Sequence, residues 1–183
     1  MSPADSSKLD TLKFDVEVST WYHEFRRGLF STMVSCVRAI SLVGSIIALF
    51  AISGWVEAGP TRVAIVAIVA VVIGIVNLFD LVFQFDYLAR EHSSLYQRFK
   101  MLQVKIIRSQ MDWRRWIDEW ESEAQDIRVN EPPTYWALYN ICRNMILQKY
   151  KKELGNVRVV TPRQRMLRHF KHYQPDDFVP ADT

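Results

Sequence analysis

The chain has 183 residues, a formal net charge of +3 and 23% charged residues, and its mean hydropathy of -0.05 would suit a soluble protein. This average conceals two uncharged apolar runs, residues 39–56 and 63–79, so composition alone excludes neither a soluble nor a membrane protein. The two cysteines, Cys36 and Cys142, fall in regions expected to lie far apart, which argues against a mutual disulfide and favours a reducing compartment.

Residues 1–28 are expected to form an amphipathic helix that leads into the first apolar run. Its apolar positions recur at helical spacing at Leu9, Leu12, Val16, Tyr22, Phe25 and Leu29. This apolar face is expected either to lie on a membrane or to pack against the C-terminal helices.

The two apolar runs predict membrane-spanning helices over residues 29–56 and 63–86, joined by a short external link, 57–62. A bilayer core about 30 Å thick requires roughly 20 helical residues, and so short a link makes the two spans antiparallel neighbours. Lys and Arg number 4 before Gly28, one in the link and 17 from Tyr87 onward. The positive-inside rule therefore places both termini in the cytoplasm.

No Pro or Gly occurs between Ile75 and Asn130, so the second span is expected to continue as one long cytoplasmic helix. A seam with largely alternating steps of four and three, the coiled-coil pattern, runs through Leu88, His92, Leu95, Phe99, Leu102, Ile106, Ser109, Trp113, Trp116, Trp120 and Ile127. Pro132 and Pro133 are expected to reverse the chain into a returning helix, giving an antiparallel helical hairpin over residues 87–155.

The predicted fold is therefore an all-α membrane protein, in which a transmembrane helical hairpin continues through its second helix into a cytoplasmic antiparallel helical hairpin. Residues 156–183 are expected to form a basic, partly disordered tail, because three prolines interrupt it and its last residues are rich in Asp and Pro.

Polar residues in or beside the predicted spans are the first candidates for function, because charge inside a bilayer is costly. They are Arg38, Ser41, Ser45, Asn77, Asp80 and Gln84. Arg38 and Asp80 are almost equally distant from the middle of the link, which favours an ion pair between them. The alternative is that Arg38 extends to headgroups and Asp80 to water.

Each predicted span carries a stripe of small or polar residues at helical spacing. The stripes comprise Ser31, Ser35, Arg38, Ser41 and Ser45 in the first span, and Ala67, Ala70, Gly74, Asn77 and Gln84 in the second. Such stripes can hold helices together by close packing and hydrogen bonds. Alternatively, a stripe lines a water-filled path, which requires several subunits because two helices cannot enclose one.

Trp113, Trp116 and Trp120 share one helical face, which is expected to pack against the returning helix or to contact a partner or another subunit. The basic residues expected to contact lipid headgroups are Arg26, Arg27, Arg163, Arg165, Arg168 and Lys171. Nucleic acid is not an expected partner.

Catalytic and cofactor-binding motifs are missing from the sequence, so neither an enzyme nor a bound cofactor is expected. No phosphate-binding glycine loop and no nucleophile with its base can be picked out. His169 and His172 have a spacing usable by a metal, but their neighbours are basic and no thiolate accompanies them, so no metal site is expected.

The chain resembles the SLATT domains (SMODS and SLOG-associating two-transmembrane effector domains) over nearly its whole length. The resemblance rests on the N-terminal segment with Tyr22, Phe25 and Arg26-Arg27, on the close hairpin, on the continuation Phe85-Asp-Tyr-Leu-Ala-Arg-Glu-His-Ser-Ser-Leu-Tyr-Gln-Arg-Phe99, and on Asn130-Glu-Pro-Pro133 before a helix with Cys142 and Asn144.

The resemblance implies a pore-forming membrane effector of a prokaryotic anti-phage conflict system, located in the cytoplasmic (inner) membrane. It also implies a nucleotide-synthesising or nucleotide-sensing partner protein. We expect a homo-oligomer in the lipid bilayer that forms an ion-permeable channel gated through its cytoplasmic helices. The alternatives are a non-conducting membrane scaffold that recruits a soluble partner and, less favoured by only two spans, a coupled transporter.

Overall fold

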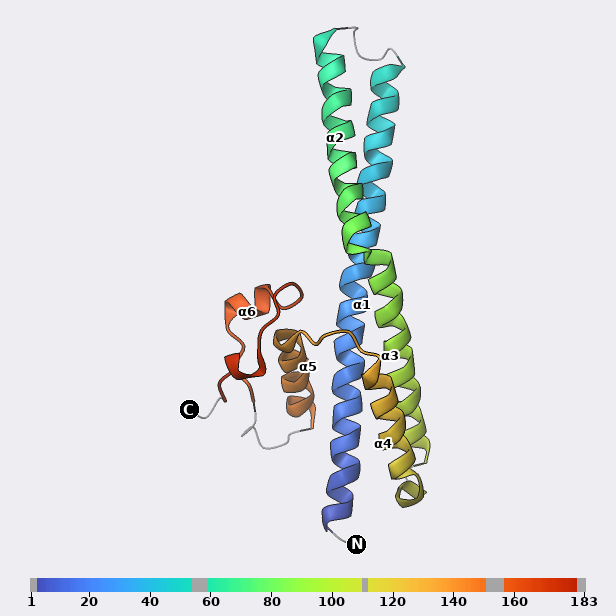
Figure 1. The fold of residues 1–183 in the computed structure, drawn as a ribbon, viewed down its shortest axis with the longest axis vertical. Coiled ribbons are helices and arrows are strands. Elements are labelled where there is room, and N and C mark those ends of the chain that lie inside the picture. Colours follow the sequence, from blue (N-terminus) through green and yellow to red (C-terminus); the bar gives the residue numbers. More distant parts are fainter. Residues whose placement is uncertain (1–2, 54–58, 110–111, 151–156, 181–183) are drawn as a thin grey trace. The chain divides into compact units, whose positions relative to one another are not determined.

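The computed structural model describes residues 3–53, 59–109, 112–150 and 157–180 (Figure 1). Its helices are α1 (Pro3–Ile52), α2 (Pro60–Phe83), α3 (Phe85–Arg108), α4 (Trp113–Val129), α5 (Trp136–Lys149) and α6 (Pro162–Met166), followed by the 3-10 helix η2 (Pro175–Asp177). The described part of the chain has no strand beyond the isolated bridge between Arg158 and Pro180. The predicted all-helical class is confirmed.

The chain divides into two compact units, which we call the bundle unit (Met1–Arg26 with His92–Thr183) and the hairpin unit (Arg27–Glu91). Helices α1 and α3 each contribute to both units. The chain therefore passes between the units twice, after Arg26 and again before His92.

In the hairpin unit the second half of α1 and α2 run antiparallel. Both candidate spans are long and apolar enough to cross a membrane, and only 6% and 0% of their most apolar windows are buried. Large apolar side chains such as Leu42 and Leu81 are 64% and 73% exposed. These helices are therefore not core helices of the chain, and their outer surface matches what a bilayer would cover.

Small residues bring the two hairpin helices together. A Cβ placed on Gly44 would lie 2.6 Å from Cδ1 and 2.9 Å from Cγ1 of Ile73, so glycine lets α2 approach α1 closely at this level. Ala51 is also buried on this face. The packing of small against large residues is the arrangement that helices use in lipid, where no hydrophobic effect drives them together.

The bundle unit has a conventional apolar core between α1, α3 and α4. The core contains Leu9, Leu12, Val16, Leu95, Phe99, Leu102, Ile106, Ile117, Trp120, Ala124 and Ile127. Most of the predicted N-terminal face and helical seam is present in this set. The N-terminal face therefore packs against the C-terminal helices, which was one of its two predicted positions.

The prediction of one uninterrupted helix as far as Asn130 is wrong, because the chain breaks twice without Gly or Pro. Gln84 adopts a left-handed conformation (φ 49°) and caps α2, its N–H donating to Asp80 O at 2.8 Å. A second break follows Ser109, where α3 ends with Lys105 and Arg108 in its last turn and α4 begins at Trp113. Basic side chains at this end are favourable for the helix dipole.

The second break changes which helix covers the seam. Helix α4 folds back along α3, and the two are joined by an ion pair between Lys105 and Glu123 at 2.8 Å. The helix that follows Pro132 and Pro133 is thus α5, and it packs on Val18 and Tyr22 of α1 through Leu138, Cys142 and Ile146.

The C-terminal segment is also more ordered than predicted. A capping box between Thr161 and Gln164 begins α6, and Tyr173 and Phe178 pack on Ala137 of α5. Phe178 is only 2% exposed, so the expectation that the last residues lack structure is wrong for the segment as far as Pro180.

Candidate functional site

A buried polar cluster lies in the bundle unit at the end where α1 and α3 leave for the hairpin. We call His23, Arg26, His92, Glu131 and His169 the junction cluster. His23, His92 and Arg26 are 0%, 1% and 4% exposed. Arg26 and His92 are the bundle residues at the two points where the chain passes to the hairpin unit. Buried polar groups of this kind are costly unless they are paired.

Hydrogen-bond direction fixes the tautomer of His92. Arg26 Nε donates to His92 Nε2 at 3.5 Å, so that nitrogen has no proton and neutral His92 carries its proton on Nδ1. His92 Nδ1 lies 3.0 Å from His23 Nδ1 and therefore donates to it. On the other side of the His23 ring, Nε2 lies 3.4 Å from Glu131 Oε1.

Aromatic rings enclose the cluster. The His23 ring stacks on Phe99 at 5.6 Å with an interplanar angle of 12°, and the Arg26 guanidinium lies 4.1 Å from the centre of the Tyr135 ring. Tyr135 N donates to the Tyr22 hydroxyl at 3.1 Å, which fixes the start of α5 beside α1. The rings exclude water and strengthen the hydrogen bonds inside.

Burial disfavours the charged form of three members of the cluster, Arg26, His92 and His169. Burial, with help from neighbouring His23 and the Arg26 guanidinium, lowers the pKa of His92 to about 3. Burial and then the neighbouring Arg168 and Arg26 lower the pKa of His169 to about 4, and burial lowers the pKa of Arg26. His92 is thus neutral at physiological pH, which agrees with its role as an acceptor from Arg26.

The cluster ties together four segments that are distant in the sequence. Helix α1 provides His23 and Arg26, α3 provides His92, and the connection between α4 and α5 provides Glu131. The fourth is the loop after α6, where His169 O accepts from Arg26 NH1 at 2.7 Å. A change in any one of these segments therefore alters the contacts of the residues that adjoin the hairpin.

Sequence reasoning missed this cluster, although His92 was assigned to the buried seam. The sequence did contain one signal for the cluster, because a buried histidine on an apolar seam requires a polar partner. Arg26 was assigned to lipid contact, and this assignment is wrong because its guanidinium is buried among the aromatic rings. Arg27, the next residue, is only partly exposed.

The structure does not assemble His169 and His172 into a metal site. The His172 ring lies against Tyr135, with centroids 4.0 Å apart, whereas Arg168 Nε donates to His169 Nε2 at 3.1 Å. Within the described ranges no group of three potential metal ligands comes together.

In the hairpin unit the two polar stripes lie on the same flank. Ser41 Oγ donates to Asn77 Oδ1 at 3.0 Å, which joins the stripes directly. The other eight members of the two stripes are exposed: Ser31, Ser35, Arg38, Ser45, Ala67, Ala70, Gly74 and Gln84. By helical periodicity Ser45 follows Ser41 on α1, and Gly74 lies one turn before Asn77 on α2. Ser35 and Ser45 donate to the carbonyls of Ser31 and Ser41 in their own helix, so their oxygens need no partner from α2.

A second flank of the hairpin carries an apolar groove. This shallow groove of about 370 Å³ is lined by Ala39, Ile40, Val43, Gly44, Ile47, Ile68, Val69, Val72 and Ile73. The hairpin thus has one flank with hydroxyl and amide groups and another that offers only aliphatic carbon.

The predicted ion pair between Arg38 and Asp80 is not formed. The guanidinium of Arg38 instead lies 3.7 Å from Asp86, which follows the apolar segment of the second span at the start of α3. Asp86 also pairs with Arg90, one turn further along α3. The predicted register is nevertheless correct at Ser41 and Asn77, and the long Arg38 side chain extends past the level of Asp80 toward the charged end of the hairpin.

The tryptophan face lies at the core of the bundle unit. Trp120 is 3% exposed, and Trp113 and Trp116 are partly buried against the same core. Arg114 and Arg115 lie over the rings of Trp113 and Trp116. Of the two predicted uses of this face, packing is therefore observed, although its partners are α1 and α3 rather than α5.

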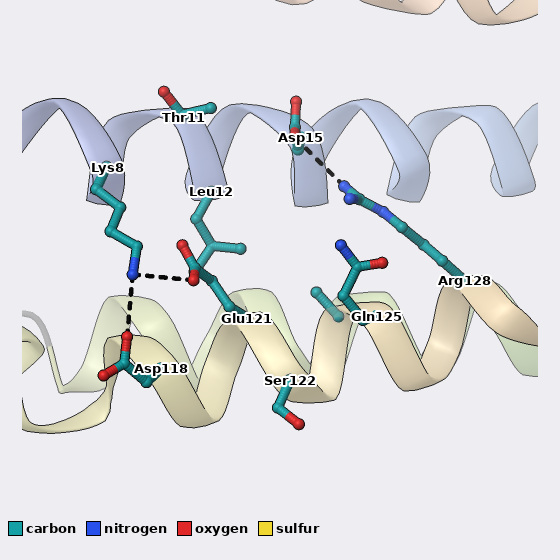
Figure 2. A pocket seen from close by; sticks show the side chains of 10 residues that line it. Lys8, Thr11, Leu12, Asp15, Asp118, Glu121, Ser122, Gln125 and Arg128 are labelled. Atoms are coloured by element: carbon teal, nitrogen blue, oxygen red, sulfur yellow. Dashed lines mark hydrogen bonds and ion pairs between the residues drawn. The ribbon is translucent and has the colours of Figure 1, made fainter.

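A polar groove of about 620 Å³ lies between α1 and α4 (Figure 2). Lys8 crosses it to Asp118 and Glu121, both at 3.0 Å, and Arg128 reaches Asp15 at 3.4 Å. These charged groups neutralise one another across the groove. Because they are partly exposed to solvent, these pairs contribute little to stability.

Comparisons with protein-family models, with curated proteins and with solved structures found no match. The resemblance to SLATT domains therefore stays a prediction.

Proposed function

We propose that the protein is an oligomeric membrane effector whose hairpins together surround an ion-permeable path across the cytoplasmic membrane. The observation that supports this proposal most is the division of the hairpin into a polar flank, joined by the Ser41–Asn77 hydrogen bond, and an apolar flank. In a ring of hairpins the polar flanks would face a central path and the apolar flanks would face lipid or neighbouring subunits.

Electrostatics at the inner end suits this arrangement. Arg38 and Asp86 have side chains that are 74% and 48% exposed, so a ring of subunits would place paired charges around the cytoplasmic mouth. Hydroxyl and amide groups further along would replace part of an ion's hydration. Charged rings and polar linings are the usual means by which narrow channels admit ions.

The bundle unit is the proposed gate. The two chain connections to the hairpin adjoin Arg26 and His92, and both residues belong to one hydrogen-bonded cluster. A partner or signal that moves α5 or the loop after α6 would change that cluster and, through it, the helices that enter the hairpin. Such coupling requires an element with two states. The two states proposed here are the junction cluster with its hydrogen bonds formed and the same cluster with these bonds broken.

The resemblance to SLATT domains supports a proposed role in prokaryotic anti-phage defence. Under this proposal the chain acts as the membrane-disrupting component, and a nucleotide-synthesising or nucleotide-sensing protein supplies the signal. The proposal includes no enzymatic activity and no resident cofactor for this chain.

Ion flux through the purified protein in liposomes tests the proposal, with Gly74→Leu as the informative variant. A Cβ at Gly74 meets nothing within 4 Å, so a leucine there fits the isolated chain and adds bulk only to the polar flank. Flux should fall by about tenfold or more, since an apolar constriction excludes water. Val72→Leu, on the apolar flank, is the matched control and should leave flux unchanged.

Mass determination of the purified protein in detergent or nanodiscs completes the test. A monomer, or a lack of flux when the bundle unit is perturbed at Arg26, would overturn the pore. An oligomer that binds a soluble partner but shows no flux when Arg26 is perturbed would favour the non-conducting scaffold.

A further inference from the structure

The segment from Arg163 to Lys171, which we call the basic loop, exposes both cations and apolar side chains. Arg163, Arg165 and Lys171 are exposed, and Met166 and Phe170 are 73% and 60% exposed. The sequence has no Asp or Glu between Thr161 and Pro175. No ion pair to these three cations is found among the described residues.

The basic loop is held in place by buried anchors. Gln164 is buried and completes the capping box with Thr161. In the middle of the loop, His169 O accepts from the buried Arg26 side chain at 2.7 Å. Tyr173, directly beyond the loop, is 8% exposed against α5. The exposed cations and apolar groups are therefore presented on a fixed backbone rather than on a free tail.

Contacts along α1 show that the basic loop lies beside Arg26 within the bundle unit. Glu17 is hydrogen-bonded to Lys149 at the end of α5, and Tyr22 is hydrogen-bonded to Tyr135, directly before the start of α5. One turn further, Arg26 is bonded to the basic loop. The loop thus contacts the last bundle residue of α1, and the next residue, Arg27, belongs to the hairpin unit.

We propose that the basic loop is a docking surface for anionic lipid headgroups of the cytoplasmic leaflet. Arg163, Arg165 and Lys171 supply the charge complementarity, and Phe170 and Met166 enter the interfacial layer beside them. Combined basic and apolar side chains are the composition that binds such surfaces. This inference rests on the proposed function, because it needs the hairpin to span the bilayer.

The experiment places an environment-sensitive fluorophore on Phe170→Cys in the full chain reconstituted into liposomes. Cys36, which is exposed, is first replaced by Ser, while Cys142 is buried and burial raises the pKa of its thiol to about 12, so it does not react. Quenching by brominated lipids is compared between phosphatidylcholine vesicles and vesicles that also contain phosphatidylglycerol.

The expected result is quenching that requires the anionic lipid. It should be lost in the combined variant Arg163→Glu, Arg165→Glu, Lys171→Glu. The matched control Lys100→Glu, Arg108→Glu, Arg115→Glu changes three exposed cations elsewhere in the bundle unit and should retain the quenching. A fluorophore on Ile107→Cys, at a position in the last turn of α3 that is 59% exposed, should stay unquenched in both vesicle types.

Extraction with alkaline carbonate separates the two possible failures. If the chain stays in the membrane but the Phe170→Cys fluorophore is unquenched, the proposed lipid surface is overturned. Equal quenching in neutral and anionic vesicles overturns it as well. Both results leave the proposed function standing. Fluorophore shielding that instead rises with the amount of protein per vesicle overturns the lipid surface in favour of contact between copies. A chain that alkaline carbonate releases overturns both proposals.

Discussion

The two halves of α1 differ in the exposure of their apolar side chains, which are buried in the first half and exposed in the second. In the bundle unit Leu9 and Val16 are 6% and 0% exposed, whereas in the hairpin unit Leu42 and Leu49 are 64% and 67% exposed. The polar groups are reversed as well, since Arg26 is buried and Arg38 is exposed. The first half of α1 thus has the pattern of a helix in water, with apolar side chains inside. The second half has the pattern of a helix in lipid, which is the environment proposed for it.

The largest effect expected from this contrast concerns core truncation. Phe99→Ala removes a ring that is 0% exposed in the bundle core and should destabilise that unit by about 3 to 5 kcal/mol. Leu49→Ala removes an exposed side chain of the hairpin and should change stability by under about 1 kcal/mol. Urea unfolding of the full chain in detergent, followed by tryptophan fluorescence, measures both values. Equal losses would contradict the contrast.

The next effect concerns the buried cation of the bundle unit. Arg26→Met leaves His92 Nε2 and His169 O without this donor, which should cost about 2 to 3 kcal/mol. The exposed Arg163→Met serves as its control and should stay within about 0.5 kcal/mol of the parent chain. The same urea unfolding measures both variants, and a neutral result for Arg26→Met would show that the cluster contributes little.

The third prediction is a pH dependence that arises only in the bundle unit. The unfolded chain protonates His92 below about pH 6.5, whereas the folded chain does so only near pH 3. The unfolded state therefore binds more protons in this window, and stability falls as pH falls, by about 1.4 kcal/mol per pH unit for one group. Unfolding midpoints between pH 7 and pH 4 measure this slope.

His92→Gln should remove that contribution to the slope, although it also lowers stability at every pH. His172→Gln, at an exposed histidine, is the matched control and should leave the slope unchanged. A parent chain whose stability is flat between pH 7 and pH 4 would contradict a neutral buried imidazole.

The smallest effect concerns the exposed ion pair of the hairpin. A double-mutant cycle on Arg38→Ala and Asp86→Ala should give a coupling of about 0.2 to 1 kcal/mol, because both side chains are largely exposed. A cycle on Arg38→Ala and Asp80→Ala should give none. Coupling to Asp80 that exceeds coupling to Asp86 would restore the pair predicted from the sequence.

Hydrophobic periodicity predicted the helical class, the seam and much of the core, because burial depends on spacing that is visible within a few turns. It did not predict the breaks at Gln84 and after Ser109, where no glycine or proline marks the change of direction. At the second break the gain comes from tertiary packing of α4 on α3 and α1, a contribution that local propensity does not contain.

The candidate site divides in the same way. The stripes that meet at Ser41 and Asn77 could be predicted, since a six-residue link fixes the register of the two helices. The junction cluster could not, because His23 and His92 are separated by 69 positions and Arg26 meets a carbonyl 143 positions away. Contacts at such separations depend on the complete fold.

The bond between Arg26 and His169 has a consequence for biosynthesis. Ribosomes make the chain from its N-terminus, so residues 27–91 can enter the translocation machinery before His169 has been polymerised. Until then the Arg26 guanidinium has no carbonyl from the basic loop and stays hydrated. Under the proposed topology, this hydrated cation would favour retention of the N-terminal segment in the cytoplasm while the hairpin is inserted. Completion of the C-terminal segment would then withdraw that charge from water, after the orientation of the hairpin has been set.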